Sequence, residues 1–235
     1  MSAAAAEQPT PTPTEQPTPA PVVEAQHLSL VGLEGPVFTD VSLAVQPGRL
    51  TVLVAPGGRG RSSLLLALCG RMRGCTGSVL WHGRPVRSGR DLRAVRRGAS
   101  VARISTFVMP EARLTVAESV VEHALLDGIR PAAAERAFAA AEDLLGVRLD
   151  RATLAERLTT YERSILAVAL ALVRPADLVV LDDLDADLDL DDQRRLADAL
   201  VRLAASGHAV LASTTEPSSV PSDAVLVTLA APQES

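Results

Sequence analysis

A glycine-rich segment carries the first residue pattern that points to chemistry. Residues 55–63 read APGGRGRSS; they follow a β-rich run at 49–54 and lead into a stretch of helical spacing that starts at Ser62. A strand, a glycine loop and a helix in this order form the context of a phosphate-binding P-loop. Its backbone N–H groups and the positive end of the helix dipole then face an anion. The residues expected to bind the phosphates are Gly57, Gly58, Arg59, Gly60, Arg61, Ser62 and Ser63.

The side chains of this segment have separate expected roles. The glycines let the backbone approach a ligand without a side-chain clash, and the hydroxyl of Ser62, or of Ser63, would contact magnesium. The usual pattern is GxxxxGK[ST], whereas this chain has Ala55 at the first glycine and Arg61 at the lysine. All 23 basic residues are arginine. A planar guanidinium is not a simple substitute for a compact ammonium. We therefore expect the loop to keep affinity for phosphate, with a different geometry of the contact between Arg61 and the phosphates.

A second pattern ends in two acids. The four apolar residues 178–181 are followed by Asp182 and Asp183. A uniformly apolar run of this length is typical of a buried strand in a parallel sheet. An acid at the carboxyl end of such a strand, next to the strand that leads into the P-loop, can hold magnesium through water. The sequence therefore predicts a Mg²⁺ site at Ser62 and Asp182, with Asp183 as the candidate catalytic base for an attacking water.

The acidic run 182–192 also allows two readings that involve no magnesium. In the simpler one it is a solvated acidic surface. In the second, the alternating Asp185, Asp187 and Asp189 would form a calcium loop. Such a loop needs a glycine at its sixth position and a glutamate at its twelfth, and this run has neither, which disfavours calcium.

The elements that must position these residues alternate between strand-like and helix-like runs. Composition and period predict strands at residues 25–31, 41–45, 49–54, 77–81, 99–104, 178–181 and 209–213. Helical spacing, with Pro131 and Gly146 as the start and stop of one segment, predicts helices at 62–71, 114–126, 131–145, 161–173 and 191–205. This order predicts an α/β fold with a mostly parallel core and a helical insertion.

Composition limits the classes of function. A chain of 235 residues with 47% hydrophobic residues fits one sizeable domain. Aromatic residues make up 2% and the net charge is −5, so we expect no nucleic-acid partner, because base stacking and attraction to phosphates are both weak. The basic stretch 84–103 is best interpreted as a solvated face. Cys69 and Cys75 indicate neither a disulfide framework nor a zinc site.

The N-terminal end differs from the rest of the chain. Residues 1–21 contain repeated Pro-Thr units, which predict an extended, disordered tail before one domain at residues 22–230. The tail lacks the basic and apolar regions of an export signal. The longest apolar run, 165–173, is far shorter than the roughly 20 residues that span a bilayer. We therefore expect a cytoplasmic protein that is soluble by itself.

Longer segments resemble the ATP-binding-cassette (ABC) ATPase family, over roughly residues 24–216. The strand pair before Walker A resembles FTDVSLAVQPGRLTVLVAP at 38–56, and the strand and turn after it resemble GSVLWHGRPV at 77–86. The start of the helical subdomain resembles LTVAES at 114–119. The signature helix with Walker B and the D-loop resembles LTTYERSILAVALALVRPADLVVLDDLDADLD at 158–189.

The resemblance implies a structure and partners. It implies a P-loop NTPase core with an N-terminal antiparallel β part and a small helical subdomain at about residues 106–161. It also implies ATP and Mg²⁺ as cofactors, a homo- or heterodimer of cassettes, and a membrane-embedded transporter or channel-like subunit that presents a short helix to the helical subdomain. The protein would then lie at the inner face of the membrane through that partner.

Several positions depart from the family pattern. Asp183 replaces the catalytic glutamate and is one methylene shorter, and a misplacement of about 1 Å can cost about 100-fold in rate. No glutamine occurs near Arg103 to Ser105, where the Q-loop glutamine is expected, and Thr215 stands at the switch histidine. Ala55 would cost roughly 1 to 2 kcal/mol if it kept a left-handed family conformation.

The signature LSGGQ is LTTYE here, at residues 158–162. In the family, two glycines at this helix start expose backbone N–H groups to the ATP of the opposite subunit. Thr160 and Tyr161 occupy those positions, and Glu162 adds an acid. We therefore expect impaired binding of ATP in trans, with Thr159 or Thr160 as a suitable helix N-cap.

Two hypotheses follow. In the first, the chain is an ATP-binding subunit that binds Mg-ATP, hydrolyses it weakly and couples to a membrane-embedded partner. In the alternative, it is a catalytically silent pseudo-ATPase that acts as the scaffold or regulatory half of an ABC-type complex. A P-loop kinase is disfavoured because no lid motif with arginine pairs follows the core, and the segment 158–189 would have no role in one.

Overall fold

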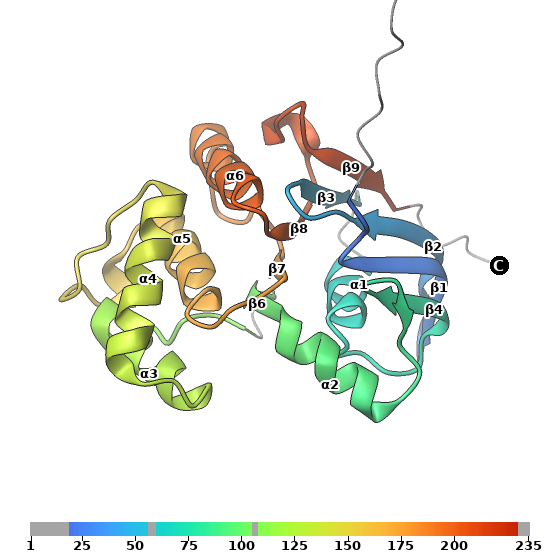
Figure 1. Cartoon of the computed structure of the whole chain (residues 1–235). Helices are drawn as coiled ribbons and strands as arrows, with labels where there is room; N and C mark the ends of the chain where they lie inside the picture. Colours follow the sequence, from blue (N-terminus) through green and yellow to red (C-terminus); the bar gives the residue numbers. More distant parts are fainter. Residues whose placement is uncertain (1–18, 56–59, 105–107, 230–235) are drawn as a thin grey trace, which may run out of the picture.

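The computed structural model describes residues 19–55, 60–104 and 108–229 (Figure 1). Gly57, Gly58 and Arg59 of the predicted phosphate site lie outside the described residues, as do Ser105 and residues 1–18 of the predicted tail. The division into a tail, one domain and a helical subdomain stays a prediction.

In the described part of the chain, five strands form a parallel sheet. Their order is β6 (Ala99–Arg103), β7 (Leu178–Leu181), β8 (Ala209–Thr214), β3 (Leu50–Val54) and β9 (Val225–Thr228). Every residue of β3, β7 and β8 is buried. Parallel strands are joined by crossover segments that cover both sheet faces, which explains why their sequences are apolar without alternation.

A four-stranded antiparallel sheet lies beside this core. Its order is β2 (Gly35–Val45), β1 (Val23–Gly32), β4 (Thr76–Trp81) and β5 (Arg84–Pro85). At Gly77 the backbone has φ 91°, and an added Cβ would lie 2.3 Å from the carbonyl oxygen of His27. Only glycine fits where β4 crosses β1 this closely.

Six α-helices and two short 3₁₀ segments occur in the described residues. They are α1 (Arg61–Leu68), α2 (Gly89–Gly98), α3 (Val116–Leu126), α4 (Pro131–Leu145), α5 (Thr160–Ala171), α6 (Leu190–Ala205), η1 (Ala155–Arg157) and η2 (Pro217–Ser219). Helices α3, α4 and α5 pack on one another and form a lobe at one side of the parallel sheet (Figure 1). Within the described ranges, every helix is too short or too polar to cross a bilayer.

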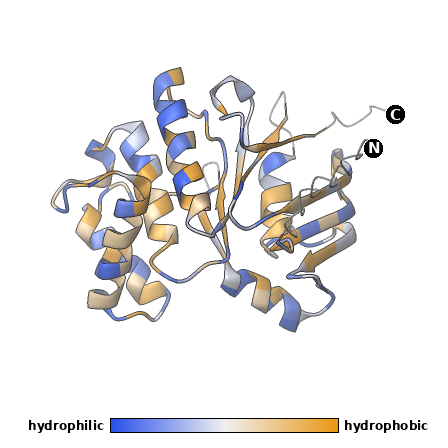
Figure 2. Ribbon diagram, turned by 45° about the horizontal axis from the view of Figure 1, so that its top comes forward, coloured by the Kyte–Doolittle hydropathy of each residue, from blue (hydrophilic) through white to orange (hydrophobic). Residues whose placement is uncertain are grey.

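The core lies on both faces of the parallel sheet. Along β7, Leu178 and Val180 pack with α1 and the antiparallel sheet, whereas Val179 and Leu181 pack with the helices α3 to α6. This alternation follows from the two-residue period of a strand. Figure 2 shows apolar strands inside and amphipathic helices outside. The core therefore fixes both the strand ends and the starts of the helices that follow them.

The predicted fold class is confirmed, because the structure combines a parallel α/β core with an antiparallel β part. The predicted helix 131–145 and strand 178–181 have the observed bounds. The sequence patterns missed α2, β9 and the first half of β2. Helix α2 is rich in arginine and buries only Val95, although Ser88 and Asp91 form a capping box at its start. Strand β9 is a short, half-exposed edge strand, which gives a weak pattern.

A buried acid organises the loop after α4. The carboxylate of Glu142 accepts hydrogen bonds from Leu149 N–H at 2.8 Å, from Arg151 at 2.7 and 2.8 Å, and from Arg148 at 3.3 Å. Burial alone raises the pKa of Glu142, but the hydrogen bonds from Arg151 and Leu149 and the charge of Arg151 bring it below its usual value. Folding therefore favours the charged form of Glu142.

We expect Glu142→Gln to lower the free energy of unfolding by about 3 kcal/mol at pH 7, because it removes one partner of a buried ion pair. Asp143→Asn is the matched control, because Asp143 also pairs with Arg148 but is exposed, and it should cost less than about 1 kcal/mol. Urea unfolding measures both.

The pH dependence has a defined sign. A carboxyl whose pKa is lower in the folded state stabilises the protein above its unfolded pKa of about 4.3 and loses this effect as the pH falls through the folded value. The difference between wild type and Glu142→Gln should therefore shrink in acid. An equal cost for both variants, or a cost that does not change with pH, would contradict this account.

Candidate functional site

The ends of β7 and β8 and the start of α1 meet at one acid, Asp182. Its side chain is fully buried. Ser62 Oγ donates a hydrogen bond to Asp182 Oδ2 at 2.5 Å, and Ser213 Oγ donates one to Oδ1. Because Leu181 pairs with Ala212 in the parallel sheet, the next residue of each strand reaches the same edge. The structure thus brings the predicted pair Ser62 and Asp182 together.

Arg61, the first residue of α1, forms a nearly buried ion pair with Asp183. Its Nη2 donates to Asp183 Oδ1 at 2.6 Å, and the two side chains are 6% and 24% exposed. The Nε and Nη1 groups of Arg61 are buried and have no hydrogen-bond partner among the described residues. A buried donor without a partner costs about 1 to 3 kcal/mol, and more when it is charged. The site therefore holds N–H donors that an anion would satisfy.

The turn before α1 depends on a glycine. Gly60 has φ 85°, and a Cβ there would lie 2.4 Å from the carbonyl oxygen of Val37. Ala55, at the other end of the P-loop segment, is not among the described residues with positive φ, so the cost expected for a left-handed alanine does not arise. Ser63 lies in the first turn of α1 and is half-buried there.

Arg103, at the end of β6, is a central residue that the sequence patterns did not place in the site. Its Nε and Nη2 donate to the carbonyl oxygen of Asp182 at 3.2 and 3.1 Å, and Nη2 also donates to that of Asp183 at 2.5 Å. Its Nη1 donates to Ser164 Oγ of α5 at 2.9 Å. Burial lowers the pKa of Arg103, and the Asp183 and Asp182 carboxylates oppose this. Arg103 therefore ties the two acids to the helical lobe.

The backbone of Asp183 is constrained. Its φ is 50°, a left-handed value that costs about 1 to 2 kcal/mol for a residue other than glycine. Its N–H donates to Ser213 Oγ at 3.0 Å, and the N–H of the next residue, Leu184, donates to the Ser213 carbonyl at 2.7 Å. Strain of this kind is typical of functional sites. The structure fixes the direction of the Asp183 side chain toward Arg61.

Thr215, the residue expected at the switch-histidine position, is held by Asp185, which lies in the segment after β7. Its N–H donates to Asp185 Oδ2 at 2.9 Å, and its hydroxyl donates to the same oxygen. Burial raises the pKa of Asp185, but the two hydrogen bonds from Thr215 and the charge of Arg61 bring it below its usual value. Asp185 thus stays charged and links β8 to the segment after β7.

The segment predicted to be the signature forms a regular helix start. Thr159 is the N-cap of α5: its Oγ1 accepts from Glu162 N–H at 3.1 Å, and the Glu162 carboxylate accepts from Thr159 N–H at 2.9 Å. Tyr161 is buried, and the Arg195 guanidinium lies 4.2 Å from its ring centroid. Of the two predicted N-caps, the structure uses Thr159 rather than Thr160.

The acids that could have formed a calcium loop have different partners. Asp185 binds Thr215, and Asp189 caps α6 by accepting from Asp192 N–H at 2.8 Å. Among the described residues, no cluster of three histidine, cysteine or acidic side chains has a metal-binding arrangement. Mg²⁺ that binds with a nucleotide usually takes most of its ligands from water and phosphate oxygens.

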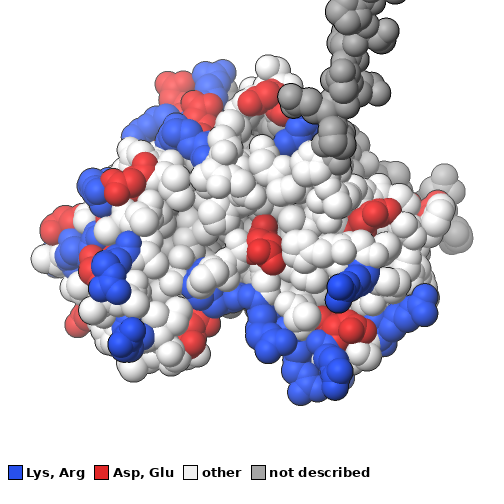
Figure 3. All heavy atoms as spheres, viewed as in Figure 1, with Lys and Arg blue, Asp and Glu red and all other residues white. Residues whose placement is uncertain are grey.

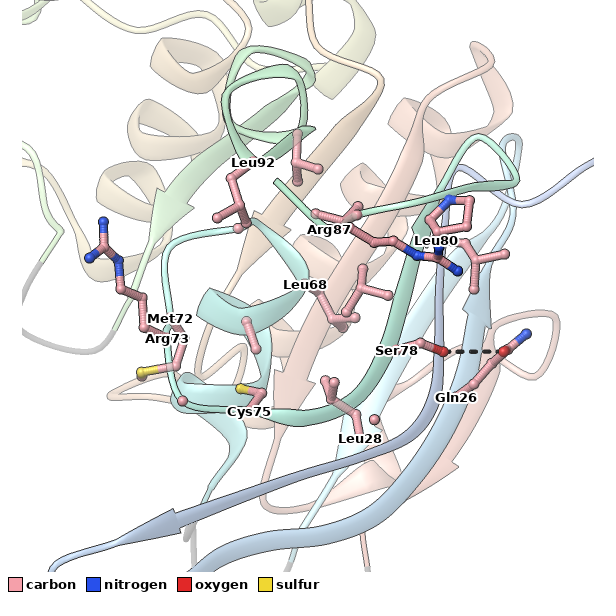
Figure 4. Close-up of a pocket in the computed structure, with 18 of the residues that line it drawn as sticks. Gln26, Leu28, Leu68, Met72, Arg73, Cys75, Ser78, Leu80, Arg87 and Leu92 are labelled. Atoms are coloured by element: carbon pink, nitrogen blue, oxygen red, sulfur yellow. Dashed lines mark hydrogen bonds between the residues drawn. The ribbon is translucent and has the colours of Figure 1, made fainter. Parts of the chain in front are cut away.

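A separate cavity of about 680 Å³ lies between α1, β4 and α2 (Figure 4). Gln26 and Ser78 are hydrogen-bonded at its edge, and Cys75 lines its wall. Burial raises the pKa of the Cys75 thiol, and that of Cys69 to about 12, so neither is a reactive thiolate at neutral pH. The candidate phosphate and magnesium residues that the structure describes do not line this cavity, whose apolar walls include Leu28, Leu68, Leu80 and Leu92.

Sequence comparison relates the chain to known proteins. A model of the ABC transporter family matches residues 38–186. The chain is 32% identical over 175 residues to the ribose import ATP-binding protein RbsA of Rhodococcus jostii (strain RHA1), covering 73% of this chain and 34% of that protein. It is 30% identical over 182 residues to an ATP-dependent lipid A-core flippase of Xanthomonas campestris pv. campestris (strain 8004), covering 73% of this chain and 30% of that protein. The chain spans about a third of the length of these relatives.

Solved structures share the fold. The structure of cbiO1 from Clostridium perfringens, part of the ABC transporter complex cbiONQ, superposes with a TM-score of 0.76 at 16% identity, covering 89% of this chain and 85% of that one. A nucleotide-free ATP-binding cassette from an ABC transporter gives a TM-score of 0.74 at 17% identity, covering 89% and 87%. The family model covers more than half of the chain and agrees with the motifs and the fold, so the chain belongs to the ABC transporter family, among its ATP-binding cassettes.

Proposed function

We propose that this chain is a Mg-ATP-binding subunit that hydrolyses ATP weakly and couples to a membrane-embedded partner. The observation that carries the proposal is the ion pair between Arg61 and Asp183, with two buried guanidinium N–H groups of Arg61 left without a partner in the described residues. A buried cation with spare donors at the start of a helix favours a polyanionic ligand.

The phosphates would bind at the start of α1. Arg61 takes the place of the family lysine and donates from Nε and Nη1, while the loop Gly57 to Gly60 and the hydroxyls that follow it supply the other donors. Ser62 and Asp182 would hold Mg²⁺, because a hydroxyl and a carboxylate are the oxygen ligands that this ion prefers. When bound, Mg²⁺ neutralises charge on the phosphate oxygens.

Asp183 is the candidate base for the attacking water. In the structure its carboxylate accepts a charge-assisted hydrogen bond from Arg61, which makes it a poorer base because the charged form is stabilised. A polyanion that draws Arg61 away would remove this hydrogen bond from the Asp183 carboxylate. Binding of the polyanion and activation of the base Asp183 are thus linked through the side chain of Arg61.

Three features support weak rather than fast hydrolysis. Asp183 is shorter than a glutamate, so its reach toward a water is reduced. Thr215 is engaged by Asp185, which leaves its position without a γ-phosphate sensor. Arg103 stands beside the Q-loop position and donates to protein carbonyls and Ser164. Each missing contact removes stabilisation that a fast ATPase makes in the transition state.

Assembly and place in the cell belong to the same proposal. We propose a dimer of cassettes bound to a membrane-embedded subunit at the inner face of the membrane, with residues 22–230 as the cassette and about 106–161 as its helical subdomain. The relatives named for sugar import and lipid flipping differ in cargo, so no cargo is assigned.

The alternative is a silent pseudo-ATPase. It is supported by the signature segment, where the side chains of Thr159 and Glu162 cap α5 reciprocally and a buried tyrosine replaces a glycine. A chain of this kind would keep the fold to bind its partner, and a second, intact cassette would do the hydrolysis. Nucleotide binding and turnover separate the two hypotheses.

Mg-ATP titration in a calorimeter tests the phosphate site. We expect saturable binding by the wild type and at least about tenfold weaker binding by Arg61→Ala, because charge-assisted hydrogen bonds contribute about 1.5 to 3 kcal/mol. Arg90→Ala, at an exposed position of α2, is the control and should bind as the wild type does. No heat at millimolar ATP would favour the silent alternative, and equal binding by Arg61→Ala would remove Arg61 from the site.

Asp183→Asn tests the link between binding and catalysis. We expect ATP to bind several-fold more tightly, because Arg61 loses its competing carboxylate, while phosphate release falls to the background rate. Asp191→Asn, on the exposed face of α6, is the control. Weaker ATP binding by Asp183→Asn would show that Asp183 does not compete for Arg61. Unchanged turnover would show that Asp183 is not the base.

A further inference from the structure

The cavity between α1, β4 and α2 is separate from the proposed phosphate site (Figure 4). The α1 residues that line it are Ala67 and Leu68, whereas Arg61 and Ser62 lie at the start of the same helix. At a rise of about 1.5 Å per residue, Ser62 and Leu68 are about 9 Å apart along the helix axis. The cavity volume of about 680 Å³ falls within the range of small-molecule sites, about 300 to 1,000 Å³. The cavity therefore has the size of a second ligand site.

Most of the cavity wall is apolar. Its larger apolar side chains come from separate elements and include Leu28 of β1, Leu68 of α1, Leu80 of β4 and Leu92 of α2, together with Met72. Leu28 and Leu68 are buried, whereas Met72, Leu80 and Leu92 are half-buried. Half-buried apolar side chains around a hollow leave apolar surface that the hydrocarbon part of a ligand can cover. The wall thus favours an alkyl chain.

The neutral polar side chains at the cavity edge already have partners. Ser78 Oγ donates to Gln26 Oε1 at 3.2 Å, and Gln26 Nε2 donates to Glu24 Oε1 at 2.7 Å. A strongly polar ligand such as a sugar needs several uncommitted hydrogen-bonding groups, because each of its own polar groups loses water when it is buried. The wall therefore disfavours a sugar.

The charged side chains that line the cavity are both basic. They are Arg73 and Arg87, and no acid among the described residues lines it. In the part of the chain that the structure describes, neither guanidinium has an ion pair or a hydrogen bond. The backbone of Arg87 is fixed, because its N–H donates to Asp91 Oδ2 at 3.0 Å. This excess of positive charge favours an anionic head group.

The surroundings of the cavity have the same sign of charge. Figure 3 shows basic side chains gathered over α2, beside the part of the molecule that contains α1 and β4. The chain as a whole carries a net charge of −5. The positive charge near the cavity is therefore a local feature, and it attracts an anion that the rest of the surface repels.

We propose that this cavity binds a single-chain amphipathic anion, a medium-chain fatty acid. The alkyl chain covers Leu68, Leu80 and Leu92, and the carboxylate pairs with Arg87. The charge of Arg73, which Figure 4 shows on a different side of the cavity from Arg87, adds to the attraction. Binding requires neither a nucleotide nor a membrane partner, so this inference is independent of the proposed function.

A free fatty acid suits the cavity better than a membrane surface does. Surface binding to a bilayer needs apolar side chains that reach into the boundary between head groups and acyl chains. Here the apolar side chains lie around a hollow. A single chain that enters the hollow can contact them, whereas a bilayer meets only its rim.

Calorimetric titration of the full chain with octanoate, decanoate and dodecanoate, each below its micelle concentration, tests the ligand class. We expect saturable binding that tightens at least about tenfold for each two carbons added, because one buried methylene contributes about fourfold. The neutral 1-decanol should bind at least about tenfold more weakly than decanoate, and decyltrimethylammonium should not bind.

Variants test the place of binding. Arg87→Gln should weaken decanoate binding about three- to fivefold, and the double variant Arg73→Gln/Arg87→Gln at least about tenfold, which is the scale of partly exposed ion pairs. Arg90→Gln is the matched control, because Arg90 is exposed on α2 and does not line the cavity. It should bind decanoate as the wild type does.

A second pair of variants tests the wall. Leu92→Glu places an acid on the apolar wall and should abolish decanoate binding. Ala94→Glu adds the same acid to the same helix at an exposed position that does not line the cavity, and its affinity should change less than about twofold. Far-UV circular dichroism shows whether both variants are folded, and the arginine variants test the site independently of this pair.

Several outcomes would overturn the inference. They are the absence of saturable heat with every carboxylate, equal affinity for decanoate and 1-decanol, or equal effects of Arg87→Gln and Arg90→Gln. Sedimentation with phosphatidylglycerol vesicles adds a fourth: binding to vesicles that depends on Arg87, without binding of the free fatty acids, would assign the arginines to a membrane surface instead.

Discussion

The arrangement of the site depends on one fully buried carboxylate, that of Asp182. A buried charge is costly unless hydrogen bonds compensate it, and here Ser62 and Ser213 both donate to it. These two hydrogen bonds join the start of α1 to the ends of β7 and β8. Asp182 holds these three segments together, and the residues next to Ser62 and Asp182, Arg61 and Asp183, also pair.

The pairing of Arg61 with Asp183 gives a physical reason why the proposed site would bind a polyanion and yet hydrolyse it weakly. A guanidinium has five donors in a plane, and Asp183 uses only one of the Arg61 nitrogens. The same contact engages the carboxylate that would accept a proton, and the left-handed backbone of Asp183 fixes its direction. Beyond this pair, Arg103 links the two acids to α5 through Ser164. A change at the proposed phosphate site would therefore have a direct route to the helical lobe.

The features that the sequence predicts well are those set by local pattern. The apolar run before Asp182 predicts a buried strand and the acid at its end, and Pro131 and Gly146 give both ends of α4. The sequence patterns did not indicate the partner of Arg61, because Asp183 is far away in the chain and the contact depends on how the strands align. They also missed Arg103 for the same reason, since an arginine at the end of a strand gives no sign of which carbonyls it reaches. The sequence patterns also missed helix α2, because its many arginines are typical of a solvated segment.

We propose that Arg61 pairs with Asp183 in the absence of nucleotide and binds the phosphates in its presence. A crystal structure of the chain with Mg²⁺ and a non-hydrolysable ATP analogue tests it most directly. The account predicts the Arg61 guanidinium on the phosphate oxygens, Ser62 and Asp182 at the metal, and Asp183 released from Arg61. An analogue bound at the loop with the Arg61–Asp183 ion pair still at its present 2.6 Å would contradict it.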